Sequence, residues 1–219
     1  MLRTVFFNFI ISTTGTLLFA SCSSKKPALQ LPYYNTPDFT PHFLSDKNAV
    51  SKEITHTIPA FSFIDQNGKS ISNKNIEGGI HVANFIFTRC GSICPVMTDN
   101  MKLIDSAFKN NAAVQILSFS VTPWIDSVPA LRKFAASHNI ESNNWHFLTG
   151  NKGEIYKLAR QSYFAEEDLG FTKDSTEFLH TEHILLVDKT QRIRGIYNGT
   201  LQLEMQQLIE DIKTLQQED

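Results

Sequence analysis

Cysteine is scarce in this chain, whose 219 residues include only three: Cys22, Cys90 and Cys94. A small scaffold held together by disulfides would be far richer in cysteine, so that class is excluded. An excess of basic charge is also missing, because 20 Lys and Arg stand against 22 Asp and Glu and give a formal net charge of −2. Binding to phosphate backbones requires clustered positive charge, so no nucleic-acid partner is expected.

A long apolar run is missing as well. The most apolar segment, residues 1–21, is interrupted and is shorter than the roughly 20 consecutive apolar residues of a membrane span. It begins with Arg3 and ends in small residues directly before Cys22, which is typical of a secretion signal. It resembles a bacterial lipoprotein signal, in which the cysteine is lipidated and becomes the new N-terminus. An uncleaved anchor and an ordinary cleaved signal are the alternatives, and all three place the body of the protein outside the cytoplasm.

Residues 22–55 are rich in proline, since they hold four of the eight prolines of the chain. Proline opposes regular helices and central strands, so this segment is predicted to be a tether between a lipidated Cys22 and a folded domain at 56–219. Four aromatic residues indicate that part of the tether packs on the domain or on a partner: Tyr33, Tyr34, Phe39 and Phe43.

The folded domain shows strand and helix patterns in alternation. A hairpin is predicted at 61–72 around Asn67-Gly68, because this dipeptide is a strong tight-turn signal. Apolar runs predict strands, and apolar residues at spacings of three and four predict helices. The expected strands are 81–88, 113–121, 145–148, 183–188 and 192–197, and the expected helices are one that carries Met97, Met101, Ile104 and Phe108, then 127–138, 152–162 and 201–215. Such alternation predicts an open α/β sheet with flanking helices, and the polar segment 163–179 is predicted to be a loop.

Cys90 and Cys94 lie where the strand predicted at 81–88 ends and the next helix begins. The unpaired N–H groups and the macrodipole of a helix N-terminus favour negative charge. A thiol in that place tends toward the thiolate, the form that attacks disulfides and binds metals. Pro95 fits the first helical turn, where its missing N–H costs nothing.

The spacing of the two cysteines leaves several chemistries open. Three residues separate them, whereas two separate the common redox pair. Cysteines four apart at a helix start can point the same way, so they can close a disulfide or chelate a soft metal such as Cu(I) or Zn. A purely structural disulfide is a further alternative, but so short a loop would constrain the unfolded chain little. We therefore take Cys90 and Cys94 as a redox dithiol and as candidate metal ligands.

The sequence around the cysteines resembles the Sco (SCO1/SenC) family. The resemblance rests on the run FTRCGSICP, which ends at Pro95. It continues in three further segments, 120–123, 145–150 and 180–181. It implies a thioredoxin-like open sheet with an N-terminal β-hairpin, copper binding and a role in the assembly of respiratory oxidases. The family's metal site consists of two cysteines and one histidine, which implies Cys90, Cys94 and His180 as copper ligands.

Two histidines compete for the third ligand position, His180 and His183. The alignment of the following strand favours His180, and extended residues three apart point to opposite sides, so both are not expected to face the cysteines. The remaining five histidines are scattered and are expected to have structural or solvated roles. The sequence departs from the family at Gly91, Thr122 and Leu179, where the family often has Pro, Asp and Asp. The acid missing before His180 would have fixed the imidazole.

Three functions are open. The first is a copper metallochaperone, a binding protein rather than an enzyme, which carries Cu(I) or Cu(II) to the CuA centre of a terminal oxidase subunit. The second is a thiol–disulfide oxidoreductase that reduces a specific partner and is served by a thioredoxin-like reductant. Thioredoxin-type oxidoreductases carry a cis-proline facing the cysteines, and no proline follows Pro129, which argues against general oxidoreductase work but leaves the reduction of a specific partner open. A peroxide-handling protein that uses Arg89 beside Cys90 ranks last. We predict the metallochaperone, lipid-anchored and facing the periplasm.

Overall fold

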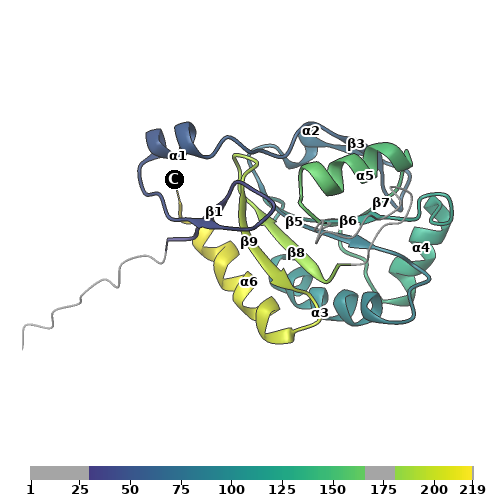
Figure 1. Ribbon diagram of the computed structural model, residues 1–219. Coiled ribbons are helices and arrows are strands. Elements are labelled where there is room, and N and C mark those ends of the chain that lie inside the picture. Colours follow the sequence, from purple (N-terminus) through teal and green to yellow (C-terminus); the bar gives the residue numbers. More distant parts are fainter. Residues whose placement is uncertain (1–29, 166–180, 219) are drawn as a thin grey trace, which may run out of the picture.

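The computed structural model describes residues 30–165 and 181–218. Its strands are β1 (Tyr33–Tyr34), β2 (Pro41–His42), β3 (Ser62–Ile64), β4 (Ser70–Ser72), β5 (Ile80–Ile86), β6 (Val114–Ser120), β7 (Trp145–Leu148), β8 (His183–Val187) and β9 (Ile193–Asn198). Its helices are α1 (Lys47–Glu53), α2 (Asn73–Ile76), α3 (Ile93–Phe108), α4 (Val128–Ser137), α5 (Lys152–Gln161) and α6 (Gln202–Leu215). Seven strands form one sheet in the order β2-β1-β9-β8-β5-β6-β7, and β3 pairs with β4 in the predicted hairpin. Helices flank this sheet on both faces, so the predicted open α/β architecture is confirmed (Figure 1).

The directions of the strands bring several chain segments to one end of the sheet, where strands start or stop. β5, β6 and β7 are parallel, whereas β8 is antiparallel to β5 and β9 is antiparallel to β8. β5 and β6 therefore end side by side, with Ile86 paired to Ser120, and β8 begins on the same side at His183. We call this end of the strands, defined by Ile86, Ser120 and His183, the cysteine end of the sheet.

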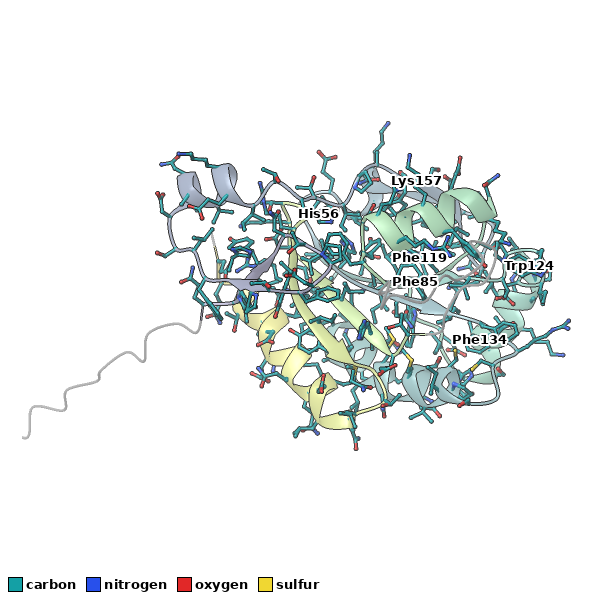
Figure 2. All side chains as sticks on the ribbon, viewed as in Figure 1. His56, Phe85, Phe119, Trp124, Phe134 and Lys157 are labelled. Carbon is teal, nitrogen blue, oxygen red and sulfur yellow. The ribbon has the colours of Figure 1, made fainter. Side chains whose placement is uncertain are left out.

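Side-chain alternation along β5 divides the core between the two faces of the sheet. Val82 and Ile86 belong to an apolar cluster with α3, α4 and α6. Ala83 and Phe85 point the other way, into a second cluster that includes α5 and the β3–β4 hairpin. The apolar stripe predicted on α3 lies in the first cluster and is fully or nearly fully buried, because it faces the sheet: Met97, Met101, Ile104 and Phe108. Figure 2 labels Phe85 and Phe119, which stack at 5.5 Å in the second cluster.

The part of the N-terminal segment that is described, residues 30–55, is added to the edge of the sheet. Tyr34 in β1 pairs with Ile193 in β9, and β2 pairs with β1. Phe39 packs edge-on against both Tyr34 and Phe164, with ring centroids 6.1 Å apart in each pair. Tyr34 and Phe39 thus contact the domain, whereas Phe43 is 64% exposed. The helix α1 occurs where the prolines predicted none, and the two strands lie at the outer side of the sheet, where proline is tolerated.

Buried Arg194 in β9 holds the start of this segment. Its guanidinium donates to the backbone oxygens of Leu31 and Pro32 at 2.9 and 3.0 Å. It also forms ion pairs with Asp188 at 3.2 Å and with Glu218 at 2.7 Å. The ring of Tyr33 lies 3.9 Å from the guanidinium carbon. We call these six residues the arginine clasp, and it joins the N-terminal segment to the end of the chain.

Two sequence predictions need correction. The last helix was predicted to begin at Leu201, but α6 begins at Gln202, and Leu201 is its N-cap and is 50% exposed because it precedes the first packed turn. The start of the polar loop predicted at 163–179 is buried instead, since Tyr163, Phe164 and Ala165 belong to the second cluster. Residues 166–179 lie outside the described part of the chain. Within the described ranges, no helix is both long and apolar enough to cross a bilayer.

Candidate thiol and metal site

The two cysteines occupy the predicted junction at the cysteine end of the sheet. β5 ends at Ile86, and the chain turns back when the N–H of Cys90 donates to the carbonyl of Phe87 at 3.0 Å. α3 then begins at Ile93, so Cys94 sits in its first turn. Cys94 is 2% exposed, whereas Cys90 is half-buried in the loop. Only Cys90 is open to a partner.

The surroundings of the two thiols push their pKa values apart. Burial raises the pKa of Cys90, but hydrogen bonds from the backbone N–H groups of Cys94, Ser92 and Ile93 and from the thiol of Cys94 together outweigh it, and the net pKa lies below the ordinary value of a thiol. Burial raises the pKa of Cys94 to about 12, and the charges of Cys90 and Asp126 act in the same direction. Cys90 is therefore the more exposed and more readily ionised thiol of the pair, and Cys94 is shielded from solvent.

A buried carboxylate, Asp126, lies behind the cysteines. The turn after β6 brings it there, because its N–H donates to the carbonyl of Thr122 at 2.9 Å. Its carboxylate accepts hydrogen bonds from the hydroxyls of Thr88, Ser120 and Thr122, the last two at 2.6 and 2.9 Å. The N–H of Thr88 is 3.5 Å from the same carboxylate. We call these four residues the hydroxyl cluster, and it ties the loop of Cys90 to the end of β6.

Sequence reasoning missed Asp126, because the group is assembled from distant segments. Thr88 and Asp126 are 38 residues apart in the chain. The only available signal was local: Ser120 and Thr122 alternate at the end of a predicted strand, and an acid follows four residues later. Thr122, noted as a departure from the family's Asp, is one of the donors to Asp126.

An exposed aromatic side chain lies in the turn that follows β6. Trp124, in the turn held by the hydroxyl cluster, is 60% exposed. The Nζ of Lys152 lies 4.8 Å from the centre of its indole ring. Figure 2 shows Trp124 at the periphery of the molecule, beside α4.

Of the two competing histidines, His183 belongs to the described residues. His183 begins β8, and its ring packs edge-on against Phe39 with centroids 6.0 Å apart. Along β8, Leu185 and Val187 share this face, the second cluster, whereas α3 belongs to the first cluster on the other face. His180 lies outside the described residues. Among residues 30–165 and 181–218, no group of three or more His, Cys, Asp or Glu is arranged to hold a metal ion.

Comparison with known proteins places the chain in a family. The model of the SCO1/SenC family matches residues 49–217. The chain belongs to the SCO1/SenC family. A solved structure of BsSco, described as a member of the Sco family of cytochrome c oxidase assembly proteins with a disulfide switch, is 33% identical and has a TM-score of 0.63. It matches over 75% of this chain and 95% of its own.

Two further Sco structures extend the likeness. A SCO1/SenC family lipoprotein from Bacillus anthracis str. Ames is 30% identical, with a TM-score of 0.64 over 75% of this chain and 97% of that one. Bradyrhizobium japonicum ScoI, solved with copper bound, is 23% identical, with a TM-score of 0.58 over 73% of this chain and 99% of that one, which bears on the fold. The predicted thioredoxin-like fold of a Sco domain is thus confirmed.

Proposed function

We propose that this chain is an extracytoplasmic copper metallochaperone for the assembly of a terminal oxidase. Copper would be its cargo, held by Cys90, Cys94 and His180 and passed to the CuA centre of an oxidase subunit. The observation that carries the proposal is the unequal pair of thiols at the start of α3 on a Sco fold: one half-buried with a lowered pKa, the other buried. Relatives described as oxidase assembly proteins and as copper-bound support it.

The ligand set suits both copper states. Thiolates select soft metals such as Cu(I), and imidazole binds Cu(II) well. Two thiolates and a neutral imidazole neutralise Cu(II) and leave Cu(I) with a net charge of −1. Transfer by ligand exchange would begin at Cys90, because a partner's ligand reaches its sulfur first, while Cys94 keeps hold of the ion from inside.

His180 is proposed over His183 as the third ligand. His183 packs on Phe39, on the face of the sheet away from α3 and Cys94. A ligand that meets Cys94 is therefore better sought at an odd number of residues from His183, where side chains of an extended chain take the other face. His180 is three residues away and is the position that matches the family's histidine.

A second candidate function is the reduction of a specific partner's disulfide. The unequal pKa values of the thiols favour it, because a thiolate at Cys90 can attack a disulfide and Cys94 can then close the intramolecular bond. The disulfide switch described for BsSco gives it a precedent in the family. A thioredoxin-like reductant would restore the dithiol.

Copper titration separates the two functions. The full chain with Cys22→Ser, which keeps Cys90 and Cys94 as its only thiols, is reduced and titrated without oxygen. One copper per chain, with an intense thiolate-to-Cu(II) absorption band, is expected. His180→Ala should abolish tight Cu(II) binding, and His183→Ala, the matched control, should retain it. If His183→Ala is the variant that loses copper, the ligand assignment is wrong. If the parent chain binds no stoichiometric copper but forms a readily reduced disulfide, the oxidoreductase is the better function.

We also propose that Cys22 is lipidated and anchors the chain on the periplasmic side of a membrane. The described lipoprotein relative from B. anthracis supports this proposal. Growth of cells with a labelled fatty acid should label the parent chain and not Cys22→Ser. Equal labelling of the two would exclude the anchor.

A further inference from the structure

The hydroxyl cluster contains a buried acid without a cationic partner among the described residues. Asp126 has no exposed surface, and none of the ion pairs in the described ranges includes it. Three hydroxyls converge on its carboxylate instead. Hydroxyl donors hold a carboxylate in place but leave its full negative charge, whereas an Arg or Lys would cancel that charge.

This charge lies close to the buried thiol. Thr88 donates its hydroxyl to the carboxylate of Asp126, and its N–H lies 3.5 Å from the same carboxylate. Two residues later, the N–H of Cys90 donates to the carbonyl of Phe87 at 3.0 Å, so Asp126 is bound to the turn that carries Cys90. The carboxylate accordingly acts electrostatically on Cys94. Because the interior screens charge less than water does, such an interaction is felt at the sulfur.

We propose that Asp126 is a positioning residue that holds the loop of Cys90 through Thr88 and, by its uncancelled charge beside Cys94, biases the site toward its oxidised forms. This inference rests on the proposed function of Cys90 and Cys94 and deepens it. The oxidised forms are the Cys90–Cys94 disulfide and bound Cu(II), and the reduced forms are the dithiol and bound Cu(I).

The charge balance of each couple gives the direction of the bias. Reduction of the disulfide breaks the S–S bond and takes two electrons and up to two protons from a dithiol reductant, which itself becomes a disulfide. The product carries negative charge wherever a sulfur remains a thiolate, and Asp126 repels that charge. Reduction of Cu(II) takes one electron and removes one positive charge from the site, which the carboxylate also opposes. Asp126 therefore lowers both reduction potentials.

The test is the disulfide potential of the full chain with Cys22→Ser, measured in a dithiothreitol redox buffer, so that no copper is needed. Asp126→Asn keeps the size of the side chain and removes its charge. We expect the equilibrium to shift toward the dithiol by about tenfold, a rise of about 30 mV for a two-electron couple. The matched control is Asp99→Asn, because Asp99 is a carboxylate on α3 whose side chain is 58% exposed, and it should leave the potential unchanged.

A second variant separates the charge from the geometry of the cluster. Thr122→Val keeps the charge of Asp126 and removes one hydroxyl donor, so it should leave the potential within threefold of the parent and should not raise it. If Asp126→Asn leaves the potential unchanged, or if Thr122→Val raises it as much as Asp126→Asn does, the inference is wrong. Should Asp126→Asn not fold, the Thr122→Val result alone still decides, since a tenfold rise would overturn the assignment of the bias to charge.

Copper binding by the parent and by the same variants distinguishes a failure of this inference from a failure of the proposed function. Asp126→Asn should weaken Cu(II) binding about tenfold relative to Cu(I). A parent chain that binds no copper, together with a shifted disulfide potential in Asp126→Asn, would remove the metallochaperone and leave the role of Asp126 intact. Copper binding by the parent, with both potentials unchanged in Asp126→Asn, would do the reverse.

Discussion

Two buried carboxylates lie near opposite ends of the sheet, and they have different partners. Asp188, at the end of β8, is paired with Arg194 in the arginine clasp. Asp126, at the cysteine end, accepts only uncharged donors among the described residues. The clasp pairs the carboxylate of Asp188 with a cation and joins distant parts of the chain, as a structural site does. The hydroxyl cluster preserves charge beside two thiols, where it can influence chemistry.

Removal of the cation should show how much the clasp contributes to stability. Arg194→Met leaves Asp188 buried without its partner, and we expect a loss of about 3–5 kcal/mol in the free energy of unfolding. Urea denaturation measures it. Lys213→Met removes the cation of an exposed pair with Glu210 and should cost less than about 1 kcal/mol. Equal losses in the two variants would show that the clasp is no stronger than a surface pair.

A buried base in β5 should make the fold sensitive to acid. Burial lowers the pKa of His81 to about 3, and its Nε2 lies 2.9 Å from the hydroxyl of Tyr163. Between pH 6.5 and about 3 the unfolded chain binds a proton that the folded chain does not, so stability is complete above this window and falls as the pH falls through it. The slope is up to about 1.4 kcal/mol per pH unit.

The measurement for His81 is the free energy of unfolding against pH, compared with that of His81→Gln. Other acids contribute to both proteins, so the difference between the two curves isolates His81. Parallel curves would contradict the depressed pKa.

At the cysteine end, the prediction concerns chemical reactivity: the two thiols should be alkylated at different rates. With iodoacetamide at pH 8, Cys90 in a Cys94→Ser chain should react about 100-fold faster than Cys94 in a Cys90→Ser chain, both in the Cys22→Ser background. The reason is that only Cys90 is accessible and has a lowered pKa. As the pH rises, the rate for Cys90 should level off first. Similar alkylation rates and similar pH profiles for the two cysteines would contradict the difference in exposure and pKa between Cys90 and Cys94.

The smallest effect is expected from the ring that covers the clasp. Tyr33→Leu removes the aromatic face 3.9 Å from Arg194 and keeps both ion pairs. A partly desolvated cation–π contact is worth about 0.5–2 kcal/mol, which urea denaturation can resolve. A loss as large as that of Arg194→Met would mean that the ring, and not the charge pairing, stabilises the clasp.

The sequence predictions succeeded where the interactions join residues close together in the chain, and they failed where the interactions join distant residues. The stripe on α3 and the turn at Asn67-Gly68 depend on residues a few positions apart, and both are confirmed. The clasp was missed because Arg194 binds Leu31 across 163 residues. The same holds for Asp126, whose donors come from two segments. The strands within 30–55 form because β9 offers them a free strand to pair with, and the proline content of the segment gives no information about that partner. His180 as a ligand stays a prediction.

The short strands β1 and β2 also cover a strand of the sheet through which copies of the molecule could associate. Without them, β9 would be the last strand of the sheet and would present a row of unpaired N–H and C=O groups. An open row of this kind recruits a strand from another chain. A version that begins at residue 56 would keep both cysteines but leave β9 unpaired at Ile193, so the N-terminal segment covers the part of β9 where a strand of another chain could pair.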